Sequence, residues 1–115
     1  MDETNDESVS IFVEYFGGSP YIKVLDFLIS GLGFDYSMTE VARGAGVGWS
    51  AFVNVWQKLL DREVIVATRT IGNAKLFTLN KKNEFVKGVV KLDLELTKFE
   101  LEKAYEGNVL PHKAI

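Results

Sequence analysis

The segment from Thr39 to Ile65 constrains the fold of this chain more than any other. Its sequence is TEVARGAGVGWSAFVNVWQKLLDREVI. It predicts a short helix, a turn at Gly46 and a longer helix that begins near 48–50 and ends near Arg62, because glycine readily adopts the left-handed backbone of such a turn. Apolar residues recur at helical spacing along one face of the longer helix: Phe52, Val55, Trp56 and Leu59.

A β-hairpin is predicted directly after these two helices. The β-branched run 64–68 predicts a strand, and the sequence TRTIGNAKLFTL carries the chain through a turn at Gly72-Asn73 into a second strand. Two helices joined by a tight turn and followed by a hairpin form a winged helix–turn–helix. The predicted fold class is therefore α/β in content, mainly α, with the hairpin as the wing.

Further helices are predicted before this motif. The apolar run VSIFVEYF at 9–16 predicts a short helix stopped by Gly17, with a strand as the alternative. Ser19-Pro20 is a suitable cap and first residue for a helix over 20–32. Ser37, with Glu40 three residues later, fits a capping box for the first helix of the motif.

The segment 82–106 predicts a long helix with two apolar stripes. The first stripe has alternating spacings of four and three residues: Phe85, Val89, Leu92, Leu96 and Phe99. The second stripe lies on a different face: Val86, Val90, Leu94, Leu101 and Tyr105. One stripe can pack on its own domain, but a second one would leave a large apolar patch on a monomer. We therefore expect a homodimer with the first stripe as its interface.

Four parts of the chain follow from these elements: an acidic flexible tail at 1–8, the winged-helix domain at 9–82, a dimerisation helix at 83–106 and a flexible tail at 107–115. The net charge of −3 is unevenly distributed, since residues 1–18 carry five acidic side chains and no basic one. Eight basic and five acidic side chains make the segment 19–82 mildly basic. Such a charge is compatible with contacts to phosphates.

Several classes of function have no support in the sequence. Cysteine is absent and His112 is the single histidine, so neither a metal site nor a catalytic cluster is expected. The glycines of GAGVG at 44–48 lack the preceding strand of a nucleotide-binding loop and are interpreted as a turn. We expect no enzyme activity and no cofactor. With neither a membrane-spanning run nor a signal peptide, a cytoplasmic protein is expected.

Candidate DNA contacts lie on the two motif helices and on the hairpin. On the longer helix they are Trp49, Ser50, Asn54, Gln57 and Lys58. Asn and Gln can pair with adenine, and Lys can reach guanine or phosphate. The alternative is an ordinary solvated face, and for Trp49 packing on the core is an equally good interpretation.

The other candidates are positioned for the DNA backbone or the minor groove. On the hairpin they are Arg69, Thr70, Asn73 and Lys75. The alternative for these residues is solubilising charge on a sheet edge. Arg43 on the first motif helix is a candidate for phosphate contact.

These segments resemble the archaeal winged helix–turn–helix transcriptional regulators, broadly of the MarR/ArsR kind. The matching pieces are FGGSPYIKVLDFLI at 16–29, FDYSMTEVARGAGVGWSAFVNVWQKLLDREVIV at 34–66 and RTIGNAKLFTLNKKNEFVKGVVKLDLEL at 69–96. The resemblance implies a homodimer that binds duplex DNA. Two residues depart from the family pattern: Glu63 replaces a glycine before the strand, and Trp49 occupies a position where polar or basic residues are commoner.

The sequence thus predicts a sequence-specific double-stranded DNA-binding homodimer that regulates transcription. The alternative is a winged-helix adaptor for protein interactions without DNA binding, which a pI of 5.1 suits. A third hypothesis is control by a small molecule in a cavity between the long helix and the N-terminal apolar segment, although the sequence shows no chemistry specific to such an effector.

Overall fold

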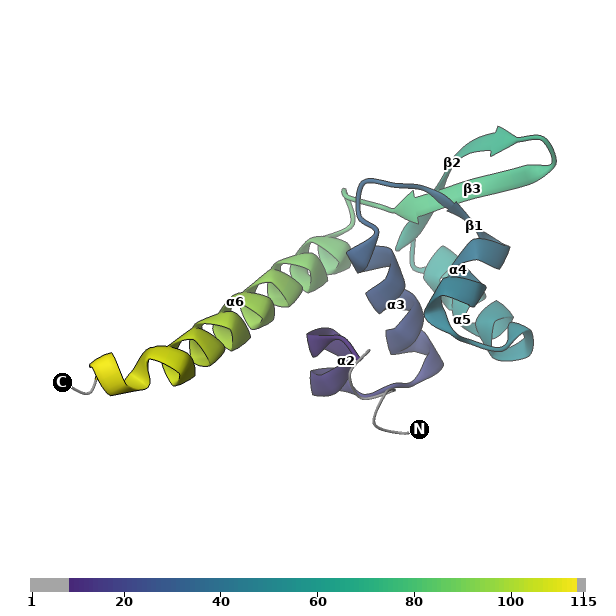
Figure 1. Ribbon diagram of the computed structural model, residues 1–115. Helices are drawn as coiled ribbons and strands as arrows, with labels where there is room; N and C mark the ends of the chain where they lie inside the picture. Colours follow the sequence, from purple (N-terminus) through teal and green to yellow (C-terminus); the bar gives the residue numbers. More distant parts are fainter. Residues whose placement is uncertain (1–8, 114–115) are drawn as a thin grey trace.

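Helices α2 to α5 and a small sheet form a body from which the long helix α6 extends (Figure 1). The computed structural model describes residues 9–113, with the side chains of residues 9–106. Its elements are α2 (Ile11–Phe16), α3 (Pro20–Ser30), β1 (Tyr36–Ser37), α4 (Met38–Ala45), α5 (Trp49–Asp61), β2 (Ile65–Ile71), β3 (Ala74–Leu79) and α6 (Glu84–Lys113). This order of elements confirms the predicted winged helix–turn–helix.

The antiparallel sheet has the strand order β1-β3-β2, so β3 lies between the short first strand and the outer strand of the wing. Strands β2 and β3 form the hairpin, in which Ile71 pairs with Ala74 next to the turn. Gly72 in that turn has a φ of +61°, which confirms the predicted turn at Gly72-Asn73. Strand β2 ends at Ile71, directly before this turn.

Serine side chains cap the first three helices, as predicted for Ser19 and Ser37 and in addition at Ser10. Ser10 Oγ accepts from the N–H of Val13 at 3.1 Å, so the apolar run after it is a helix and the strand alternative is wrong. The capping box of α4 is complete, with Ser37 Oγ accepting from Glu40 N at 3.2 Å and Glu40 Oε1 accepting from Ser37 N at 2.8 Å. Each such cap contributes about 1 kcal/mol.

Trp56 of α5 lies at the centre of the core. Its ring stacks on Phe52 with a centroid distance of 5.1 Å and meets Phe77 of β3 edge-on at 5.2 Å. The remaining helices contribute buried side chains to the same cluster: Phe12, Val24, Leu25, Leu28, Val41 and Val86. The predicted buried face of α5 is confirmed, since Phe52, Val55, Trp56 and Leu59 are all buried.

Two glycines of the segment 44–48 have different roles. Gly46 ends α4 in the left-handed conformation, with a φ of +70°, as predicted for the turn. Gly44 instead lies within α4, where an added Cβ would be 2.2 Å from the ring of Phe27 on α3. Its missing side chain lets the two helices pack closely, a role that the interpretation as a turn did not include.

Glu63, which precedes Val64 and the wing strand β2, has a left-handed backbone with a φ of +58°. The side-chain amides of Asn80 and Asn83 donate to its carbonyl oxygen at 2.9 and 3.0 Å, and these bonds help to hold the conformation. A left-handed backbone is unfavourable for a residue with a Cβ, by roughly 1–2 kcal/mol. This explains why a glycine would fit the position better.

Replacing Glu63 by glycine should raise the free energy of unfolding by about 0.5–1 kcal/mol, because relief of backbone strain exceeds the added entropy of the unfolded chain. Urea denaturation measures the change. Glu63→Ala is the matched control, since it removes the carboxylate and keeps the Cβ. Equal stabilisation by both variants would attribute the effect to charge and contradict the explanation from the backbone.

Helix α6 begins at Glu84 and is capped by Asn83, whose Oδ1 accepts from the N–H of Val86 at 3.1 Å. It runs to Lys113, past the predicted end at Glu106. The predicted N-terminal tail, residues 1–8, lies outside the described residues, as do 114–115. Among residues 9–113, no helix has the combination of length and apolar character needed to span a membrane.

One face of α6 packs on α2 and the core. Val86 is buried there, and Glu100 Oε2 accepts from the hydroxyl of Tyr15 on α2 at 2.6 Å. Asp93 lies on the same face, where burial raises its pKa and the nearby carboxylate of Asp26 raises it further. The face that docks on the domain is therefore partly polar.

Candidate nucleic-acid interface

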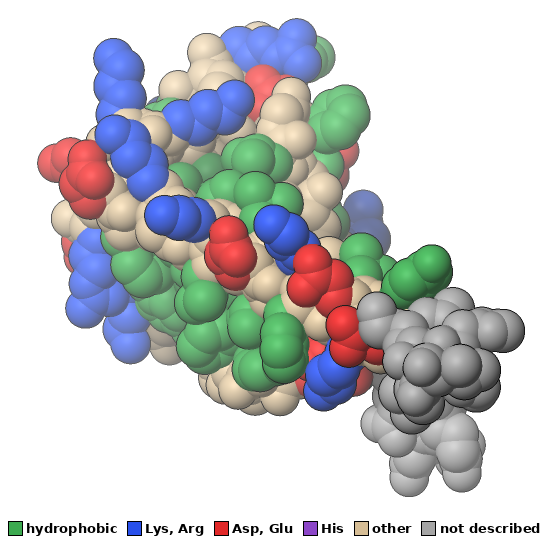
Figure 2. All heavy atoms as spheres, turned by 90° about the vertical axis from the view of Figure 1, so that its left-hand side faces the viewer, with side chains coloured by type: hydrophobic (Ala, Val, Ile, Leu, Met, Phe, Trp, Pro, Cys, Tyr) green, Lys and Arg blue, Asp and Glu red, His purple; other side chains and the backbone are tan. Residues whose placement is uncertain are grey.

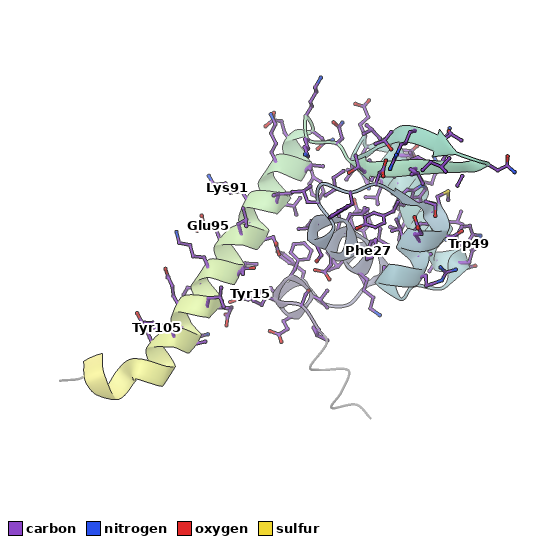
Figure 3. All side chains as sticks on the ribbon, turned by 45° about the horizontal axis from the view of Figure 1, so that its top comes forward. Tyr15, Phe27, Trp49, Lys91, Glu95 and Tyr105 are labelled. Atoms are coloured by element: carbon purple, nitrogen blue, oxygen red, sulfur yellow. The ribbon has the colours of Figure 1, made fainter. Side chains whose placement is uncertain are left out.

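The side of α5 opposite the core forms an exposed surface of polar groups, one aromatic ring and the aliphatic side chain of Val53. All five residues predicted to contact DNA from this helix are exposed: Trp49, Ser50, Asn54, Gln57 and Lys58. The wing and the start of α5, marked by Trp49 in Figure 3, lie at the end of the molecule away from α6. The fold thus brings the predicted helix and hairpin residues to one end of the molecule.

Trp49 combines the two interpretations that the sequence left open. Its ring stacks on Phe52 at a centroid distance of 5.3 Å, yet 53% of the residue remains exposed. One part of the ring therefore covers the core, and the rest is available to a partner. Gly48, the residue before α5, provides no side-chain cap, so the first N–H groups of this helix can meet an anion such as phosphate.

The polar side chains of α5 differ in whether they already make a hydrogen bond within the protein. The amide of Gln57 donates to Asp61 Oδ1 at 2.9 Å, one helical turn along. Ser50 and Asn54 make no side-chain hydrogen bond within the described part of the chain. Asn54 can therefore offer both its donor and its acceptor to a base edge, whereas Gln57 must first leave Asp61.

The wing candidates lie at two different levels of the hairpin. Thr70 pairs with Lys75 close to the turn that contains Asn73, and all three residues are exposed. Arg69 pairs with Leu76, one step further from the turn. Arg69 therefore lies on the wing as expected, but further from its tip than Thr70 and Lys75. Arg43 is exposed in the last turn of α4, before the turn at Gly46.

Arg69 is paired with an acidic residue, Asp35, that is not among the residues predicted for the site. Its Nε and Nη2 donate to the two carboxylate oxygens of Asp35 at 3.0 and 3.1 Å. The hydroxyl of Thr68 donates to the same carboxylate at 2.6 Å. The hydrogen bonds from Arg69 and then Thr68 hold the pKa of Asp35 below its usual value. Arg69 and Asp35 are 34 residues apart, and no motif links them.

The two stripes of α6 lie on either side of the face that docks on the domain. In the first stripe Phe85, Leu92 and Phe99 are exposed, whereas Val89 packs against the core. The second stripe is buried at Val86 and exposed at its far end: Leu94, Leu101 and Tyr105. Figure 2 shows green side chains on both sides of a line of charged ones. The expectation that one whole stripe packs on its own domain is therefore wrong.

A hollow of about 720 Å³ lies between α2, α3 and α4, with Ser10, Asp26 and Phe27 in its wall. The effector cavity hypothesised from the sequence would lie between the long helix and the N-terminal apolar segment. This hollow is on a different side of α2 from the docked face of α6, because its lining comes from α3 and α4 and not from α6.

Comparison with solved structures identifies the fold. The transcriptional regulator PA4135 superposes with a TM-score of 0.58 and 12% identity, over 97% of this chain and 85% of that one. A mutant of ZitR from Lactococcus lactis gives 0.55 and 17%, over 73% of this chain and 57% of that one. The PcaV transcriptional regulator from Streptomyces coelicolor, in complex with its natural ligand, gives 0.50 and 21%, over 84% and 73%.

These neighbours are winged-helix transcriptional regulators of the MarR family, which confirms the predicted fold class and the structural resemblance. The chain spans little more than half the length of ZitR. No protein-family model matches the sequence. No curated protein matches it either. Because the sequence identities are 12–21%, these comparisons show a shared fold alone.

Proposed function

We propose that this protein binds double-stranded DNA in a sequence-specific way, as a homodimer that regulates transcription. The observation that carries the proposal is the exposed polar face of α5 beside the wing, at the end of the molecule away from α6. An exposed helix of this kind fits the major groove, and a hairpin beside it can follow the backbone or the minor groove. That PA4135 and PcaV, which share the fold, are transcriptional regulators supports the assignment.

Each candidate residue then has a defined task. Asn54 and Ser50, whose side chains make no hydrogen bond among the described residues, contact base edges, and the exposed ring of Trp49 packs against sugar or base at the start of α5. The cations of α5, α4 and the wing contact phosphates: Lys58, Arg43 and Lys75. Thr70 and Asn73 add polar contacts near the wing tip, and Gln57 joins the base-reading group once it leaves Asp61.

Pairing through α6 would cover apolar surface that the protomer leaves exposed. Phe85, Leu92 and Phe99 are spaced seven residues apart and lie on one line along the helix. Val89 and Leu96, between them, complete the alternation of four and three that is typical of a coiled-coil seam. The first stripe therefore provides a dimer interface, although Val89 is shared with the core of its own domain.

The distribution of charge along α6 favours an antiparallel pair. Lys81 and Lys82 lie just before α6, residues 84–91 of the helix carry two lysines and one glutamate, and the segment 93–106 carries five acidic residues and two lysines. An antiparallel arrangement places the mildly basic start of one helix against the acidic segment of the other, whereas a parallel one opposes like charges. Because the sign changes at Leu92, this residue would meet its counterpart near the centre of the interface.

Selection of bound fragments from a pool of random duplex DNA tests the proposal. We expect enrichment of a short motif that occurs twice, because two protomers present two α5 helices. The affinity for the enriched duplex should fall steeply between low and physiological salt, since bound phosphates release counterions. Recovery of no motif, together with no retardation of any duplex at low salt, would contradict DNA binding and favour the adaptor alternative.

A further inference from the structure

We propose that Asp35 restrains Arg69 and thereby lowers the affinity of the wing for DNA of any sequence, so that recognition depends on α5. This inference rests on the proposed DNA-binding function. It assigns a specificity-determining role to Asp35, which lies in the loop before β1 and is not itself a candidate DNA contact.

The contact between Asp35 and the wing crosses the sheet. Strand β3 lies between β1 and β2, yet the carboxylate that precedes β1 reaches Thr68 and Arg69 on β2. A β-bulge between Ala67 and Arg69 interrupts the register of β2 at this point. Bulges commonly redirect a side chain. The loop itself is fixed by Thr78 of β3, whose hydroxyl donates to the carbonyl of Phe34 at 3.0 Å.

The pairing chemistry resembles that of phosphate binding. A guanidinium donates two parallel hydrogen bonds to a carboxylate and can donate the same two bonds to a phosphate group. Arg69 can therefore pair with Asp35 or with DNA through these two donors, but not with both. The side chain of Arg69 is 62% exposed and that of Asp35 only 17%, so DNA can approach the arginine while the carboxylate stays in place.

A second cation, Lys81, lies near the pair of Arg69 and Asp35. Arg69, Asp35 and Lys81 line one hollow of about 310 Å³ at the base of the wing. Asp35 offsets one of the two positive charges there. A phosphate that takes the Nε and Nη2 donors must displace the bidentate carboxylate, and one that meets the remaining N–H groups of the guanidinium lies close to the negative charge of Asp35. In both cases the carboxylate reduces the free energy that the contact yields. Arg69 thus adds little to binding of arbitrary sequences.

Asp35→Asn tests the inference, because it removes the charge and preserves the size of the side chain. The measurement is the dissociation constant for a labelled random-sequence duplex, determined over a series of NaCl concentrations. We expect at least threefold tighter binding and a log K against log salt slope that is steeper by about 1 for each protomer that engages the DNA. The double variant Asp35→Asn/Arg69→Ala should lose this gain.

Thr68→Val is the control, because it removes one hydrogen bond to Asp35 without changing any charge, and it should leave the salt slope unchanged. An unchanged slope or weaker binding for Asp35→Asn, in a variant with wild-type thermal stability, would overturn the inference and leave DNA binding intact. If neither the wild type nor Asp35→Asn binds any duplex at low salt, the proposed function itself fails.

Discussion

Replacing Asn54 by alanine should weaken binding to the selected duplex by about 30-fold or more. A bidentate contact between an amide and a base provides about 1–3 kcal/mol of discrimination, and a homodimer loses it twice. The loss of about 2–6 kcal/mol corresponds to at least 30-fold in affinity. The fold should be unaffected, because Asn54 is exposed and alanine favours helices. Fluorescence anisotropy of a labelled duplex at fixed salt measures the change.

Gln57→Ala provides the matched control on the same helix. It removes an amide that is already bonded to Asp61, so the affinity should fall less than with Asn54→Ala. Binding to a random duplex should be nearly equal in both variants, because neither change removes a charge. If Asn54→Ala weakened binding to selected and random duplexes equally, Asn54 would not read sequence.

Leu92→Asp should convert the homodimer into monomers. The substitution puts a carboxylate at the proposed centre of the interface, where the two copies would place two negative charges side by side. Sedimentation velocity at micromolar concentration measures the change in mass. Loss of the second binding module should also lower the affinity for a two-site duplex by about 10²–10⁴-fold, because linked binding is lost.

Leu94→Asp is the control, since it makes the same substitution on the second stripe of α6. We expect this variant to remain dimeric. Dissociation by Leu94→Asp but not by Leu92→Asp would move the interface to the second stripe, and a wild-type protein that sediments as a monomer would contradict the dimer altogether.

Cysteine cross-linking at the same helix reports the orientation, because the chain has no cysteine of its own. In an antiparallel pair centred on Leu92, the variant Leu92→Cys should oxidise to a covalent dimer. Phe85→Cys should cross-link only when mixed with Phe99→Cys. Cross-linking of Phe85→Cys with itself would indicate a parallel pair.

The elements of the winged helix could be predicted because their signals depend on near neighbours in the chain. Ser37 and Glu40 form their capping box within one helical turn, and Gly72 and Gly46 adopt the backbone that their turns require. Glu63 is a further local signal, because it occupies a position where the family pattern has a glycine. In the structure this residue has the left-handed backbone that a glycine would adopt more easily.

The features that could not be predicted join residues far apart in the sequence. The pairing of Asp35 with Arg69 depends on how the loop before β1 lies across the sheet, and no spacing encodes it. The close contact of Gly44 with Phe27 depends in the same way on how α3 crosses α4. The docking face of α6 was missed because it contains Asp93 and Glu100, whereas apolar spacing directs attention to the stripes beside it.

The central claim is that the exposed face of α5 reads DNA sequence. The most direct measurement is the ratio of dissociation constants for a random duplex and for the selected duplex, both at physiological salt. We predict a ratio of at least about 10³, which is typical of specific binding, and a strong reduction of that ratio by Asn54→Ala. A ratio close to one for the wild-type protein would contradict the claim.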